Sequence, residues 1–184
     1  MHPSVLGNAT KSHRYLDMTK KQIDAIDKQL ISRLSEDGRL QAGKIGEHLN
    51  ITSPTVRSRL KALTDAAVLK IAGLIDGYKT RGLTTAFVGI RLDTYQLDTK
   101  LEEISALDQV VWACVVTGQY DIIVEVISVE GMVGLHRFLS EKLYKVGGIK
   151  SSETFVVMKS KRKWILLPKG VRDKLVDINL TVGE

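Results

Sequence analysis

The chain has 184 residues, 43% of them hydrophobic, and a formal net charge of +6. This composition fits a soluble globular protein of one or two domains, and the charge favours an acidic partner. The single cysteine, Cys114, excludes an internal disulfide, and no run of about 18 apolar residues suggests a membrane-spanning helix. With no signal-peptide pattern at its start, the sequence predicts a cytoplasmic protein without a membrane partner.

The positive charge is unevenly distributed along the chain. Residues 20–80 contain eleven Lys and Arg against seven Asp and Glu, whereas residues 81–184 contain fourteen against thirteen. The basic character therefore centres on the first half of the chain, around residues 53–63.

Three segments of the first half show helical periodicity. The first is expected to begin at Thr19 or Lys20 and to end at the strong stop signal Asp37-Gly38. The second covers about residues 41–49, and a turn of about four residues separates it from the third. Three short helices with such a turn are typical of a helix-turn-helix, whose last helix enters the major groove of DNA.

The third helix carries the clearest chemistry. Ser53 is a good N-cap residue, and Pro54 suits the first helical position. The other exposed positions are small and polar or cationic, and no acidic residue occurs before Asp65. Such a face offers the donors that phosphates and base edges require, although an ordinary cationic surface helix has the same composition.

The periodicity changes in the second half of the chain. Apolar alternation and helical spacing follow one another in the order strand, helix, strand, strand, helix, strand, which is typical of a ferredoxin-like βαββαβ fold. Gly118-Gln119 is expected to form a Gly-X hairpin turn, and Gly147-Gly148 to end the second helix of this domain. The expected elements cover residues 86–92, 97–107, 110–117, 122–127, 132–143 and 149–158.

Several motifs in order carry a family resemblance. They are Asp24-x-x-Asp27-x-x-Leu30, Leu34-x-x-Asp37-Gly38-Arg39, Ile45-Gly-x-x-Leu49-x-Ile51-x-Ser53-x-Thr55-Val56-x-x-Arg59-Leu60-x-x-Leu63 and Val116-Thr-Gly-Gln-Tyr-Asp121. Over about residues 24–159 the chain thus resembles the Lrp/AsnC family of bacterial and archaeal transcription regulators. The resemblance implies an α+β protein with an N-terminal winged helix-turn-helix domain and a C-terminal ferredoxin-like domain. It also implies a short strand over residues 67–71.

The expected organisation has five parts. These are a flexible N-terminal extension (1–19), a DNA-binding domain (20–71), a linker strand (72–83), an effector-binding and oligomerisation domain (84–160) and a tail (161–184). Family members usually end before such a tail. Either the tail packs on its own domain or a neighbouring subunit, or it makes an additional contact with DNA or another partner.

The candidate DNA-binding residues lie on the second and third helices. Arg offers a bidentate fork to guanine or phosphate, and Lys offers a point charge. Arg59 holds the recognition-helix position most characteristic of the family, whereas Arg39 and Lys44 flank the second helix and suit phosphate. The full set is Ser53, Thr55, Val56, Arg57, Arg59, Lys61, Arg39 and Lys44.

The candidate effector-binding residues are Gly118, Gln119, Tyr120 and Asp121. As a hairpin turn, this segment needs a positive φ at Gly118 and backbone N–H groups bonded to Asp121. The resemblance implies in addition a pocket between subunits, in which free backbone groups and one carboxylate bind an amino acid. Ser152 and Thr154, early on the last strand, are weaker candidates from the same resemblance.

No pattern suggests a cofactor, a metal site or a catalytic group. The four histidines lack metal-ligand spacing, and Cys114 reads as a core thiol. We therefore expect a DNA-binding transcriptional regulator, not an enzyme, that assembles as a dimer or octamer and responds to a small effector. Two alternatives stay open: a siroheme-decarboxylase-like enzyme on the same fold, for which the C-terminal domain offers only His136, and a sensing module without DNA binding.

Overall fold

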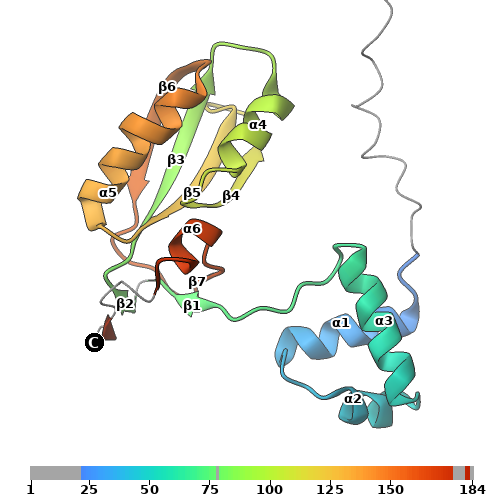
Figure 1. The fold of residues 1–184 in the computed structure, drawn as a ribbon. Coiled ribbons are helices and arrows are strands. Elements are labelled where there is room, and N and C mark those ends of the chain that lie inside the picture. Colours follow the sequence, from blue (N-terminus) through green and yellow to red (C-terminus); the bar gives the residue numbers. More distant parts are fainter. Residues whose placement is uncertain (1–21, 78, 176–180, 183–184) are drawn as a thin grey trace, which may run out of the picture. The chain divides into compact units, whose positions relative to one another are not determined.

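The computed structural model describes residues 22–77, 79–175 and 181–182. The chain divides into two compact units, with the boundary between residues 72 and 73 (Figure 1). The predicted extension over residues 1–19 lies outside the described residues. No helix in the described ranges is long and apolar enough to cross a membrane.

The first unit consists of three helices, α1 (Ala25–Glu36), α2 (Ala42–Leu49) and α3 (Ser53–Asp65). They enclose a small core of four buried side chains. The predicted start of α1 was wrong, because Asp24 caps the helix by accepting a hydrogen bond of 2.8 Å from the Asp27 backbone N–H. The predicted stop is confirmed, with Asp37 as the C-cap residue. The core residues are Leu30, Leu34, Ile45 and Val56.

The turn between α2 and α3 depends on a close backbone approach. Asn50 takes a left-handed conformation with a φ of 52°, and the Ile51 N–H donates to the Gly46 carbonyl oxygen at 3.0 Å. A Cβ atom at Gly46 would lie only 2.6 Å from the Ile51 carbonyl oxygen. Thr52 caps α3, so the predicted cap at Ser53 was one residue late. This turn holds α3 against α2.

The strand expected over residues 67–71 does not form. Ala67 adopts a φ of 54°, and the N–H groups of Val68 and Leu69 donate back to the Leu63 carbonyl oxygen. These bonds cap the end of α3 and turn the backbone away from an extended conformation. The helix-turn-helix is therefore confirmed, but the described part of this unit contains no wing strand.

The second unit is built on a four-stranded antiparallel sheet in the order β4-β5-β3-β6. Its chain order of βαββαβ confirms the ferredoxin-like prediction. Both helices of this repeat lie on one face of the sheet (Figure 1). The elements are β3 (Thr84–Leu92), α4 (Leu97–Ser105), β4 (Val110–Val115), β5 (Ile122–Ser128), α5 (Gly131–Arg137) and β6 (Ile149–Val156).

The core of this unit lies between the sheet and its helices. Ala86, Val88 and Ile90 alternate on β3 and are fully buried, as their spacing predicted. The second predicted helix continues beyond α5 as a π-helical segment, η1 (Phe138–Leu143), and a short 3-10 segment, η2 (Tyr144–Val146), before Gly147. Met132, near the start of α5, is 59% exposed.

The residues before β3 pair with residues of the tail. β1 (Ile75–Asp76) pairs with β7 (Trp164–Ile165), and β2 (Thr80–Arg81) pairs with β8 (Thr181–Val182), both antiparallel. The helix α6 (Lys169–Arg172) follows β7. Ile165 and Val171 of the tail are buried together with Ile127 of β5. The described part of the tail thus packs on its own domain.

Candidate nucleic-acid interface and effector pocket

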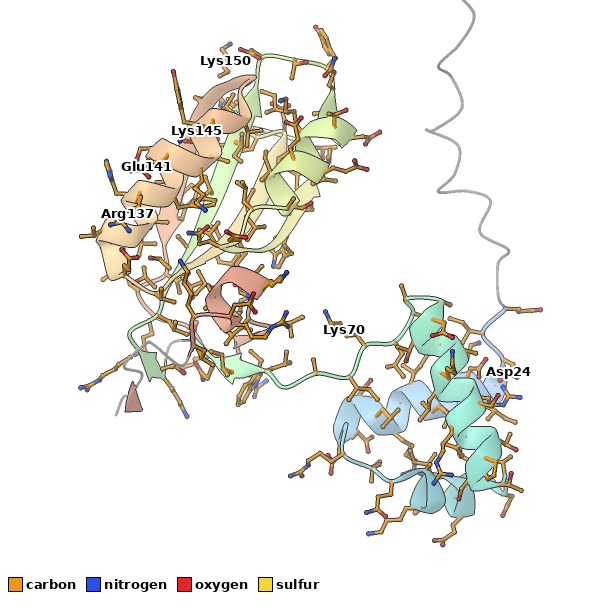
Figure 2. The ribbon with its side chains drawn as sticks, in the orientation of Figure 1. Asp24, Lys70, Arg137, Glu141, Lys145 and Lys150 are labelled. Carbon is orange, nitrogen blue, oxygen red and sulfur yellow. The ribbon has the colours of Figure 1, made fainter. Side chains whose placement is uncertain are left out.

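Arg59 of α3 is held by two aspartates of the α1 segment. Its guanidinium Nη1 lies 2.7 Å from Asp24 Oδ2 and 2.9 Å from Asp27 Oδ1. Asp27 is only 2% exposed. Figure 2 shows Asp24 at the start of α1, beside α3. Arg59 therefore faces α1 and ties the recognition helix to it.

The charges of this cluster stabilise one another. The Asp27 backbone N–H and then the Arg59 guanidinium hold the pKa of Asp24 below its ordinary value. The two carboxylates raise the pKa of Arg59 further. Asp24 and Arg59 are thus both charged at neutral pH, and Arg59 is engaged before any other partner arrives.

The outward face of α3 has a different set of side chains. Arg57 is exposed, and no described residue bonds its guanidinium. Lys61, one turn later, forms an exposed ion pair of 2.5 Å with Asp65. Thr55 is also exposed, but it points to another side of the helix than Arg57, and its hydroxyl lies 2.8 Å from that of Thr52. Arg57, Thr55 and Lys61 are therefore accessible to a ligand.

Two other candidates on α3 are less accessible. Val56 is fully buried in the core between the helices, so its inclusion among the DNA-contacting side chains was wrong. The 3.6-residue periodicity of the helix places Val56 on its buried side, away from the outer face. Ser53 is half-buried at the first position of α3.

Arg39 precedes α2, and Lys44 lies in its first turn. Arg39 is highly exposed, yet its Nε donates to Asp37 Oδ1 at 3.0 Å. That carboxylate raises the pKa of Arg39. Lys44 is exposed, and its ammonium has no acidic partner within the described ranges. Lys44 is thus the freer of the two cations.

The turn between β4 and β5 is longer than predicted. The Val116 N–H donates to the Asp121 carbonyl oxygen at 3.0 Å, which leaves four residues in the turn instead of two. Gly118 has a φ of 120°, so the predicted need for glycine is confirmed. Arg91 of β3 donates through Nε to the Gln119 carbonyl oxygen at 2.7 Å. This bond fixes the turn against β3.

Asp121, directly after this turn, lines a pocket of about 510 Å³. Its Oδ2 accepts a hydrogen bond of 2.7 Å from the Leu92 backbone N–H at the end of β3. The pocket combines two carboxylates and one ammonium group with apolar side chains. Lys150, labelled in Figure 2, comes from the start of β6. The lining residues are Leu92, Asp93, Thr94, Tyr95, Leu97, Asp121 and Lys150.

Tyr120 lies on the face of the sheet that α4 and α5 leave open. A Cβ atom at Gly89 would lie 2.8 Å from its ring, so the ring crosses β3 at this glycine. Its hydroxyl donates to the Glu153 carboxylate, which raises the pKa of Tyr120. The ring also meets Phe155 edge-on, with centroids 6.4 Å apart.

Ser152 and Thr154 lie on the opposite side of β6. Thr154 is paired with Val88 and Ser152 with Ile90, and both partners face the helices. Side chains directly opposite each other on paired strands share a face. Within one chain, Ser152 and Thr154 are therefore not brought together with the ring of Tyr120.

The open face also contains a buried carboxylate that sequence reasoning missed. Glu125 of β5 is fully buried, and its Oε2 accepts bonds from Trp112 Nε1 at 2.5 Å and Lys163 Nζ at 2.9 Å. The same ammonium lies 5.7 Å from the Phe87 ring centroid. A glutamate within the apolar run of β5 was the only signal in the sequence. Lys163 fixes the tail to the sheet.

Within the described ranges no group of His, Cys, Asp and Glu side chains has the arrangement of a metal site.

The sequence analysis also did not identify Lys150 and Asp93 as residues that line the pocket beside Asp121. Asp93 follows β3 and Lys150 lies at the start of β6; the two strands are neighbours only in the folded sheet, and neither residue belongs to a sequence motif.

Known proteins share both units. An uncharacterized HTH-type transcriptional regulator of Pyrococcus abyssi is 35% identical over 146 residues, which cover 79% of this chain and 91% of that protein. The structure of E. coli AsnC aligns with a TM-score of 0.60 at 23% identity, covering 80% of this chain and 99% of that one. A feast or famine regulatory protein from M. tuberculosis, complexed with L-methionine, aligns with a TM-score of 0.62 at 19% identity, covering 80% and 100%.

Family models match the two units separately. The AsnC-type helix-turn-helix domain matches residues 23–64, which include α1, α2 and α3. The Lrp/AsnC ligand binding domain matches residues 85–164, from β3 to the start of β7. This chain therefore belongs to the Lrp/AsnC family of transcriptional regulators.

Proposed function

We propose that this regulator binds double-stranded DNA through the outer face of α3, assembles as a dimer or larger oligomer, and responds to an amino acid bound beside Asp121. The observation that carries the proposal is the division of the cations on α3. Arg59 is engaged by α1, whereas Arg57 stands exposed without a described partner. The helix thus has one side fixed to its domain and one side open to a ligand.

The outer face of α3 has the chemistry of a DNA contact. Arg57 and Lys61 are one helical turn apart and share a side of the helix. Arg57 offers two parallel donors to a guanine or a phosphate. Thr55 lies two residues earlier, on another side of the helix, and offers a hydroxyl near the helix start, where base contacts concentrate. Lys61 can replace its exposed ion pair with Asp65 by a contact with a phosphate at little cost, because surface pairs contribute only about 0–1 kcal/mol. Lys44 extends the positive surface.

The pocket beside Asp121 suits a zwitterion. A free amino acid needs an acceptor for its ammonium group and a cation for its carboxylate, and Asp121 and Lys150 supply both in one pocket. Leu92 and Leu97 add apolar surface for a side chain. Structures of this fold have been determined with L-methionine bound in relatives from M. tuberculosis and Neisseria meningitidis. These complexes make methionine the first effector to test.

Self-association is supported by the open face of the sheet. Phe155 is 49% exposed there and Trp112 39%, and Phe87 packs beside Trp112 with ring centroids 6.3 Å apart. Exposed aromatic side chains on one sheet face are typical of an interface. Two copies joined in this way would carry two α3 helices to successive half-sites of an operator.

Thermal unfolding with each of the twenty amino acids tests the effector. An amino acid that binds the native state increases the free energy of unfolding, by about 2.7 kcal/mol at one hundred times its Kd, and so raises the unfolding temperature. Asp121→Asn and Lys150→Met should abolish the shift, whereas Lys145→Met, on the exposed surface of η2, should preserve it. A shift that survives both pocket substitutions would place the effector elsewhere. If no amino acid shifts the transition, the proposed effector class is wrong.

A further inference from the structure

We propose that the tail of this chain is a second DNA-binding element, which contacts the phosphate backbone independently of α3. This inference rests on the proposed DNA-binding function and adds a surface to it. Residues 159–174 contain seven Lys and Arg and one Asp, a net charge of +6. The family model of the ligand binding domain ends at residue 164, so much of this segment lies beyond it.

The rest of the second unit has the opposite charge. Residues 81–158 contain seven Lys and Arg against ten Asp and Glu, a net of −3. The near balance of residues 81–184 therefore conceals two regions of opposite sign. DNA would be repelled by the body of this domain and attracted only by its tail.

The tail cations are available to a ligand. Lys163 is the exception, because Glu125 neutralises it at 2.9 Å. The other six are exposed, and none of their side chains has a hydrogen-bond or ion-pair partner among the residues that the structure describes. They are Lys159, Lys161, Arg162, Lys169, Arg172 and Lys174.

These cations are carried by an ordered part of the chain. Ile165 and Val171 are each 2% exposed, and β7 pairs with β1, so the backbone between the cations is packed on the domain. Arg162 adopts a φ of 59° in the turn before β7. A packed segment loses less conformational entropy on binding than a free charged tail would. The 59%-exposed indole of Trp164 lies among the cations and adds a surface for sugar or base.

DNA is the partner that this arrangement favours. Phosphate contacts need exposed cations without acidic neighbours, and they require no base-reading geometry. Such contacts position a protein on the duplex, while α3 supplies the sequence preference. The tail should therefore strengthen binding to every duplex by the same factor.

The test compares two variants with equal charge change in the full-length protein. The tail variant combines Lys161→Gln, Arg162→Gln and Lys169→Gln. The body variant combines Arg137→Gln, Lys142→Gln and Lys145→Gln, which also removes two Lys and one Arg. Arg137 and Lys145 lie on the long helix that covers the sheet (Figure 2). Binding to a duplex selected from a random pool, and to an unselected duplex, is measured by fluorescence anisotropy at salt concentrations from about 0.05 to about 0.3 M, the range in which counterion release is measurable.

The tail variant should bind both duplexes more weakly, by at least about tenfold at about 0.1 M salt, and its salt dependence should become shallower by about 0.9 for each phosphate that it no longer neutralises. The body variant should bind as the wild type does. Equal thermal unfolding temperatures for the three proteins would show that the weaker binding is not an effect of folding.

Four results would overturn the inference. The first is an unchanged affinity and salt slope in the tail variant. The second is equally weakened binding in the body variant, which would indicate a general charge effect. The third is weakened binding that accompanies a change in the mass of the assembly by light scattering, because the tail would then bind another copy. The fourth is an effect confined to the selected duplex. If the wild type binds neither duplex, the proposed DNA-binding function itself fails.

Discussion

Arg57 and Arg59 stand two residues apart on α3, and their surroundings give them different roles. Arg59 bridges a buried and an exposed aspartate, whereas Arg57 has solvent around it. Successive residues on a helix point about 100° apart, so a separation of two residues places the side chains on different sides. One arginine thus positions the helix, and the other is free to bind.

Substitution of the two arginines by glutamine should separate these roles. Arg57→Gln should leave the unfolding temperature unchanged and make the salt dependence of DNA binding shallower by about 0.9, because glutamine cannot neutralise the phosphate that the guanidinium would. Arg59→Gln should destabilise the helix-turn-helix unit by about 1–3 kcal/mol, since Asp27 is left buried without its cation. Its salt slope should stay that of the wild type.

Chemical denaturation followed by circular dichroism, with anisotropy titrations at several salt concentrations, provides both readouts. Arg59→Lys serves as a control, because it keeps the charge beside Asp27. An Arg59→Gln protein with wild-type stability and a shallower salt slope would move Arg59 to the DNA surface.

At the scale of elements, the approach of α2 to the turn before α3 is the tightest constraint. The space beside Gly46 is closed by the Ile51 carbonyl oxygen, which a Cβ atom would approach to 2.6 Å. Gly43 lies one turn earlier on the same helix, and a Cβ atom there would meet only Ser53 Oγ at 3.7 Å, an ordinary contact. The two glycines therefore form a matched pair.

Gly46→Ala should destabilise the helix-turn-helix unit by about 1–3 kcal/mol, because the turn must shift to admit the methyl group. Gly43→Ala should be neutral or stabilise it by up to about 1 kcal/mol, because alanine favours a helix. Unfolding followed by circular dichroism measures both changes. Equal stabilities for the two variants would show that the backbone at residue 46 is not confined.

The elements predicted correctly from the sequence are those long enough to show a periodic pattern of apolar residues. Successive residues of the nine-residue strand β3 point to opposite faces of the sheet, so Ala86, Val88 and Ile90 were placed correctly on the side that the helices cover. β1 and β7 have two residues each and no period to detect, so their pairing across the chain could not be predicted. The strand expected after α3 failed because its N–H groups bond to Leu63 instead.

The candidate sites were predicted unevenly for a related reason. Asp121 belongs to a local motif and does line a pocket, but Lys150 reaches the same pocket from 29 residues away and has no motif of its own. Helical spacing gave no indication that Arg59 faces Asp24 and Asp27. Only the packing of α1 on α3 determines that contact.

The whole molecule combines a helical unit that carries α3 with a sheet unit that leaves one face open. Proposed self-association through this face predicts that a charge among its exposed aromatic side chains disrupts the assembly. Phe155→Glu should yield a monomer by light scattering and weaken DNA binding by at least about tenfold, because two half-site contacts no longer act together. Met132→Glu, on α5 and 59% exposed, should keep both properties. Retention of the wild-type mass by Phe155→Glu would exclude the open face as the interface.

The ring of Tyr120 across Gly89 has a consequence for how this sequence can vary. Because three atoms of the ring would lie 2.8 Å from a Cβ atom at residue 89, no larger residue fits there while an aromatic ring occupies position 120. The two positions should therefore change together among descendants of this chain: a side chain gained at 89 should accompany a small residue at 120. Such a double change would also release Glu153 and Phe155 from their contacts with the ring. Divergence at this one pair would thus reshape the open face of the sheet while leaving the buried side of β3 intact.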